Sequence, residues 1–188
     1  IMPLAAQNWQ TVHSSTVYAY ELNEFLAVDS TSLSGSDSIF HLYHLFRPND
    51  DQFTSLLEEE PNYFGAEVII QPTGINHFLN HQGDSLSIHT LANLGDTSRF
   101  YTYSSGAYID LVLENLDTLS FLGIQDSVKT FRMLTYSDAQ GTPVTNRMTG
   151  QTLQLSKYHG LSRLCQFHDF PNPQPAYSDS TIFRNIAG

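Results

Sequence analysis

The stretch "LQLSKYHGLSRLCQF", residues 153–167, decides between two kinds of protein. It holds Ser156 beside Lys157, a histidine two residues later and the only cysteine of the chain, so it has the residue types of a nucleophilic catalytic site. A serine–lysine pair works only when the amine reaches the hydroxyl. In a β-strand, adjacent side chains point to opposite faces, so these two side chains are expected to point apart.

The same stretch fits a β-hairpin better than a catalytic site. Residues 153–158 form two alternating sets, Leu153, Leu155 and Lys157 against Gln154, Ser156 and Tyr158. A His-Gly pair follows where a hairpin needs a residue that tolerates positive φ. There is no Gly-x-Ser-x-Gly elbow and no Ser-x-x-Lys motif in the stretch. We therefore predict a structural role, with the cysteine as a small apolar filler, for Ser156, Lys157, His159 and Cys165.

Working outward, alternation of period two recurs along most of the chain. It is seen in residues 15–23, 38–47, 66–72, 84–92, 99–104, 107–115, 127–138, 151–158 and 162–170. Turn signals such as the Asp138–Gly141 segment separate these runs. The pattern predicts a mainly β fold, an antiparallel sandwich or curved half-barrel of about nine or ten strands.

One short helix is predicted over "NDDQFTSLLEEEP", residues 49–61. Asn49 or the following aspartates can cap its start, three apolar residues share one face, and Pro61 ends it. The segment "LNEFLA", residues 22–27, is a second and weaker candidate for a helical turn.

The charge balance argues against two classes of partner. The 188 residues carry a net charge of -11, with 8 Lys+Arg against 19 Asp+Glu, and the only lysines are Lys129 and Lys157. Such a surface repels nucleic acid and anionic membrane, so neither is an expected partner. No apolar stretch approaches the ~20 residues of a membrane span.

The N-terminal residues suggest export. Leu4-Ala5-Ala6 before Gln7 is typical of the end of a signal peptide, so residues 1–6 are expected to be its remnant and the protein to be extracellular or at the cell surface. Residues 7–170 are expected to form the β domain, and residues 171–180, with three prolines, a linker. Residues 181–188 are either a last strand or the start of a following region.

Histidines and aspartates are the candidate metal ligands, and we predict neither a metal nor a cofactor. His77, His81 and His89 can converge across a hairpin, but their spacing is looser than that of most zinc motifs. None of the turn aspartates has EF-hand spacing, so turn chemistry is the expected role of Asp29, Asp37, Asp84, Asp96 and Asp138.

Two further sets of residues are candidates for ligand binding or catalysis. The aromatic residues can line a groove, but sheet packing is the favoured interpretation for Phe100, Tyr101, Tyr103 and Tyr108. Glu67 and Asp110 form a possible glycosidase carboxylate pair that no motif supports.

Three segments together resemble a known group of proteins: "FLGIQDSVKTFRML" (121–134), "DAQGTPV" (138–144) and "GQTLQLSKYHGLSRLCQFHDFP" (150–171). They are similar to the N-terminal region of large secreted Bacteroidota proteins that carry a C-terminal type IX secretion sorting domain. The resemblance covers roughly residues 80–188, and its Leu-Ser-Lys hairpin departs from the pattern at Tyr158-His159-Gly160. It implies the front portion of a longer exported protein and no particular activity. The strand order also resembles, more distantly, half-barrel lipoprotein carriers.

Three functions follow as hypotheses. The first is a non-catalytic secreted or cell-surface β domain with a binding or structural role, its partner a protein, a glycan or an apolar ligand. The second is a half-barrel carrier with an apolar ligand cavity, and the third a secreted hydrolase. A filled core, an open apolar cavity or two close carboxylates in a cleft distinguishes them.

Overall fold

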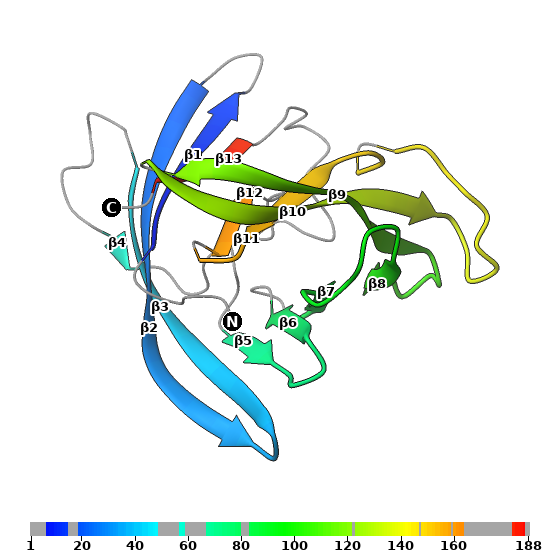
Figure 1. Ribbon diagram of the computed structural model, residues 1–188, viewed down its shortest axis with the longest axis horizontal. Helices are drawn as coiled ribbons and strands as arrows, with labels where there is room; N and C mark the ends of the chain where they lie inside the picture. The colour runs from blue at the N-terminus through cyan, green and yellow to red at the C-terminus, as the bar shows by residue number, and fades with distance from the viewer. Residues whose placement is uncertain are drawn as a thin grey trace.

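Two antiparallel sheets make up the computed structural model of the chain (Figure 1). The structure describes residues 7–14, 19–48, 57–58, 67–79, 83–121, 123–146, 148–158, 160–163 and 182–186. Strands dominate these residues and no helix occurs among them. The predicted mainly β antiparallel fold is therefore confirmed.

The first sheet has eight strands and curls into a half-barrel. Its order is β13 (Ile182–Ile186), β1 (Gln7–Ser14), β2 (Ala19–Ser34), β3 (Asp37–Pro48), β5 (Glu67–Ile70), β6 (Ile75–Leu79) and β7 (Ser85–His89), and β4 (Leu57–Glu58) pairs with β3. The long β2–β3 hairpin bends along one side of the molecule in Figure 1.

The second sheet has five strands and faces the first. Its order is β12 (Gly160–Arg163), β11 (Thr152–Ser156), β10 (Ile124–Tyr136), β9 (Tyr108–Phe121) and β8 (Thr97–Thr102). Strand β7 contacts β8, and β12 contacts β13, so the two sheets meet at both edges. The interior between them is the space in which a core or a ligand can lie.

Alternating side chains from both sheets form the core. In β9, Ile109, Leu111 and Leu113 are buried, while Asp110 between them lies on the outer face. Phe131 of β10 stands opposite Leu113 on one side and a leucine of β11 on the other. The buried cluster is Leu42, Val68, Phe78, Leu86, Ile88, Ala92, Phe100, Ile109, Leu111, Leu113, Phe131, Met133, Leu153 and Leu155. Removal of this apolar surface from water is the main contribution to stability.

A β-bulge in β9 ends this row of buried residues. Asn115 pairs with Thr130 and Leu113 pairs with Phe131, so Glu114 is an extra residue with no opposite residue in the β9–β10 register. The extra residue shifts the alternation by one, and Leu116 becomes the partner of Lys129 on the inner face. The bulge thus determines which side chains line the interior beyond the core.

The structure corrects the predicted helices where it describes them. Leu57 and Glu58 of the predicted helix over residues 49–61 form β4, and the rest of that segment lies outside the described residues. Residues 22–27 are extended in β2 because they pair with β1 on one side and β3 on the other. Local helix propensity is overridden here by pairing across the sheet.

Several terminal predictions fall partly outside the described residues. Residues 1–6 and 171–180 are not described, whereas β1 begins at Gln7 and pairs with both β2 and β13. In the part of the chain that is described, no helix is long and apolar enough to cross a membrane.

Candidate functional site

The quoted stretch forms the predicted hairpin. Strands β11 and β12 are antiparallel, with Ser156 opposite Gly160, and Gly160 has a φ of 75°. Ser156 is buried and Lys157 is exposed, so the structure places the two residues of the suspected pair in different environments. His159 and Cys165 lie outside the described residues.

Asp126 is the partner of this hairpin, and the sequence analysis missed it. Its buried carboxylate accepts hydrogen bonds at Oδ2 from the Ser156 hydroxyl and from the Tyr158 backbone N–H, the latter at 2.9 Å. The Lys157 backbone N–H donates to the Ser127 carbonyl at 3.0 Å. These bonds hold the hairpin turn against the start of β10.

The described histidines of the candidate metal set have other partners. His77 lies on the outer face of the first sheet, where its Nδ1 is 2.9 Å from the Ser87 hydroxyl and 3.2 Å from that of Ser85. His89 shares this outer face, and His81 is not described. Among the described side chains, no three or more metal-binding groups come together.

The two candidate carboxylates are on outer faces of different sheets. Glu67 pairs with His41 at 3.0 Å, opposite it on β3, and Asp110 pairs with Arg99 at 2.7 Å, opposite it on β8. The structure therefore does not bring the proposed glycosidase pair together.

The candidate aromatic residues divide between core and outer face. Phe100 is buried, and Tyr101 meets Tyr103 edge-on with ring centroids 4.9 Å apart. Burial, followed by the charge of Asp84, raises the pKa of Tyr101. Tyr108 stacks on Tyr136 at 4.5 Å and lies under the Arg99 guanidinium at 3.4 Å. The described contacts are those of sheet packing.

Two of the five turn aspartates, Asp138 and Asp96, accept hydrogen bonds from backbone N–H groups. Asp138 Oδ1 accepts the N–H groups of Gln140 and Thr142 at 3.0 Å each, and the hydrogen bonds from Thr142 are the main cause that lowers its pKa. Asp96 accepts the Asn93 N–H at 2.7 Å. Asp37 accepts from Gln71, and Asp84 interacts with Tyr101. Asp29 differs from the prediction, because it is the extra residue of a bulge in β2.

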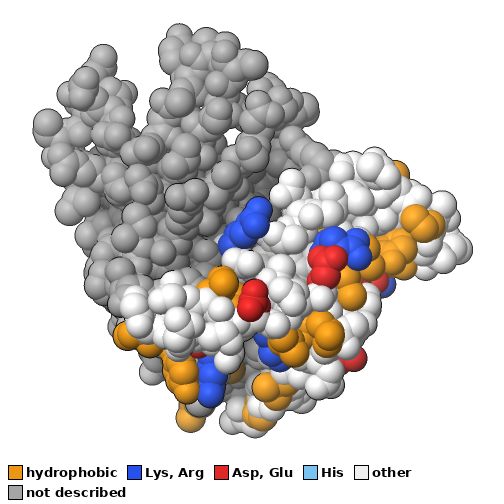
Figure 2. Space-filling view, turned by 45° about the horizontal axis from the view of Figure 1, so that its top comes forward, with side chains coloured by type: hydrophobic (Ala, Val, Ile, Leu, Met, Phe, Trp, Pro, Cys, Tyr) orange, Lys and Arg blue, Asp and Glu red, His pale blue; other side chains and the backbone are white. Residues whose placement is uncertain are grey.

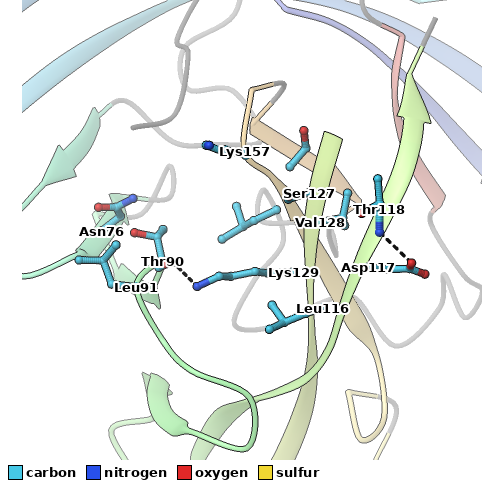
Figure 3. A pocket seen from close by; sticks show the side chains of 12 residues that line it. Asn76, Thr90, Leu91, Leu116, Asp117, Thr118, Ser127, Val128, Lys129 and Lys157 are labelled. Atoms are coloured by element: carbon cyan, nitrogen blue, oxygen red, sulfur yellow. Dashed lines mark hydrogen bonds between the residues drawn. The ribbon is translucent and has the colours of Figure 1, made fainter. Parts of the chain in front are cut away.

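A cavity of about 660 Å³ lies between the sheets beyond the core (Figure 3). Its wall on the second sheet is a row of three cross-strand neighbours, Leu116, Lys129 and Leu155. The row adjoins the buried row of Phe131, and only its central residue is polar. This row thus continues the apolar interior, with the Lys129 ammonium group as its one charged member.

The wall on the first sheet comes from β6 and the turn after β7. Asn76, Thr90 and Leu91 line it, and Figure 3 shows them on the side of the cavity toward which the Lys129 side chain extends. Thr90 is held by its N–H and its hydroxyl, which donate to the Gly74 carbonyl at 2.8 and 2.9 Å. The other lining residues are Lys157, Asp117, Thr118, Ser127, Val128 and Ser156.

Lys129 spans the cavity and joins the two sheets. Its Nζ donates to the backbone carbonyls of Thr90 at 2.9 Å and Ala92 at 2.7 Å. Burial lowers its pKa, and the nearby Asp96 opposes that shift. No carboxylate of the described residues lies within ion-pair distance of this ammonium group. Since an ammonium group has three donors, one N–H remains for a ligand.

Asn76 places a side-chain amide at the opposite wall. Its side chain is 3% exposed, and its Oδ1 is buried without a hydrogen bond from any described residue. In Figure 3 the amide nitrogen of Asn76 is on the side toward the lysines and its oxygen points away. The amide nitrogen, which is on the cavity side and is a hydrogen-bond donor, is therefore a candidate ligand contact.

Exposed leucines stand at the edges of the cavity. Leu91 is 63% exposed and Leu116 53%, values that are unusual for residues lining an apolar cavity. The face in Figure 2 shows apolar side chains in several separate groups among polar surface, with no continuous apolar band. A second cavity, of about 280 Å³, adjoins the cavity of about 660 Å³, and Asn76, Thr90 and Leu91 line both.

One signal in the sequence pointed to this site. The alternation in β10 places Lys129 on the same face as Phe131 and Met133, which are buried, and a lysine in such a row is unusual. Asn76 and Thr90 gave no comparable signal, because their approach to Lys129 depends on how the sheets face each other.

Comparisons with known proteins add no relative. The chain matches no protein-family model, no curated protein and no solved structure.

Proposed function

We propose that the chain is a non-catalytic binding domain that holds an apolar ligand between its two sheets. The observation that carries this proposal is the cavity of about 660 Å³, whose wall continues the core through Leu116 and Leu155. Small-molecule sites are typically 300–1,000 Å³, mostly apolar, with a few polar groups. An open cavity is what the carrier hypothesis requires, whereas a purely structural domain has a filled interior.

A neutral fluorescent probe tests this proposal. N-phenyl-1-naphthylamine should bind and gain fluorescence, and Leu116→Trp should weaken its binding about ten-fold by filling the cavity, a loss of ~1.4 kcal/mol. Leu94→Trp is the matched control, since Leu94 is 60% exposed against 53% for Leu116 and does not line the cavity. Equal binding by wild type and both variants, or no binding at all, contradicts the proposed cavity site.

We also propose that the domain belongs to a larger exported protein. The support is the Leu4-Ala5-Ala6 motif before Gln7, together with the resemblance of residues 80–188 to secreted Bacteroidota proteins. Mass spectrometry of the protein from its native host should find a mature N-terminus at Gln7 or Asn8. Retention of residues 1–6 on the mature protein contradicts export through this site.

A further inference from the structure

Both lysines of a strongly acidic chain line the same cavity. The net charge is -11, the only lysines are Lys129 and Lys157, and each contributes to the wall. Two lysines placed at random on the surface would not be expected to line the same cavity. A cavity that concentrates scarce positive charge is suited to an anionic group.

Two polar groups directed into the cavity, those of Lys129 and Asn76, are donors. Lys129 has one N–H beyond those given to Thr90 and Ala92, and the Asn76 amide nitrogen lies on the cavity side in Figure 3. Asp117 provides the only carboxylate among the described residues of the wall. It points away from Lys129 in the same view and accepts the Thr118 N–H at 2.7 Å. A ligand head that meets these groups must therefore accept hydrogen bonds.

Apolar side chains lie beside these donors in the cavity wall. Leu116 and Leu155 flank Lys129 in the cross-strand row, and Leu91 lies on the facing wall. An ion without an apolar tail would make no contact with these leucines, while a neutral hydrocarbon would leave the third N–H of the Lys129 ammonium group without an acceptor. An amphiphile satisfies both parts of the wall.

We propose that the ligand is a single-chain amphiphile with a carboxylate head, bound to Lys129 and Asn76 with its chain against the leucines. Two carboxylate oxygens match the remaining Lys129 N–H and the Asn76 amide, and hydrogen bonds between ionised partners are roughly twice as strong as neutral ones. Lys157, exposed at the hairpin turn over the Tyr158 ring at 4.8 Å, adds positive charge at the cavity. This inference rests on the proposed apolar-ligand function and specifies the ligand class.

The test measures displacement of N-phenyl-1-naphthylamine by dodecanoate and by 1-dodecanol at pH 7.5, below the micellar concentration. Wild type should bind dodecanoate more tightly than the alcohol. Lys129→Met should lower that preference about ten-fold, while Lys129→Arg, which keeps the charge, should retain most of it. Because the preference is a ratio within one protein, a general loss of structure does not imitate the result.

Each outcome separates this inference from the proposed function. If the probe binds but the alcohol competes as well as dodecanoate, or if Lys129→Met leaves the preference unchanged, the carboxylate assignment is overturned and the apolar cavity stands. Tighter binding of dodecyl phosphate than of dodecanoate also overturns the carboxylate assignment. If neither the probe nor any of the three amphiphiles binds, both proposals fail. If Lys129→Met does not fold, the carboxylate assignment is decided by whether wild type prefers dodecanoate over 1-dodecanol and whether Lys129→Arg retains that preference.

Discussion

Gly74→Ala should lower the free energy of unfolding by roughly 2 to 5 kcal/mol, as the sum of backbone strain and overpacking. Gly74 has a φ of +83°, where a side chain is strained, and an added Cβ would lie 2.4 Å from Cγ of Leu91. The Gly74 carbonyl also accepts both hydrogen bonds from Thr90, so any movement disturbs the cavity wall. Urea unfolding measures the change.

Gly95→Ala is the matched control for this substitution. Gly95 has a φ of +87° but no atom near an added Cβ, so only the backbone strain of about 1 to 3 kcal/mol remains. The difference between the two variants isolates the contact with Leu91. If both lose the same stability, the packing of Leu91 over Gly74 is not as described.

Asp126→Ala should destabilise the protein by about 3 kcal/mol. The substitution removes the acceptor of the Ser156 hydroxyl and of the Tyr158 N–H, and each hydrogen bond to a charged group contributes about 1.5 kcal/mol or more. Asp126→Asn keeps the size and one acceptor oxygen and should lose about half as much. Thermal and urea unfolding of the two variants against Ser156→Ala, which removes only the hydroxyl, give the comparison.

A catalytic role of Ser156 predicts that its hydroxyl reacts with a covalent serine probe. If the Ser156 hydroxyl has the structural role of donating a hydrogen bond to Asp126, a serine-reactive fluorophosphonate should not label the wild-type protein. Labelling of Ser156 that Lys157→Met abolishes would falsify the structural assignment of this hairpin.

The hairpin was predictable from sequence because its determinants are local. Alternation around Ser156 and a glycine at position 160 suffice to specify two strands and a turn, and the structure has both. The same rule placed Lys129 in one row with Phe131. It could not reveal Asp126 as the partner of Ser156, since these residues are 30 positions apart.

Features that depend on pairing between strands were harder to predict from the sequence. Residues 22–27 looked helical by composition, yet they pair with strands on both sides. The bulge at Glu114 turns Leu116 inward, and neither this residue nor its neighbours indicate an insertion. The cavity itself depends on the distance between Lys129 and the turn after β7, which two facing sheets determine together.

Chemical-shift mapping with dodecanoate tests the central claim most directly, because it locates the ligand without any substitution. Amide spectra of the isotope-labelled chain should shift most at Asn76, Thr90, Leu116 and Lys129, on both walls of the cavity between the sheets. The far tip of the β2–β3 hairpin around Gly35 should remain unchanged. Saturable shifts confined to that hairpin or to the outer faces, with none at the cavity, would contradict the account.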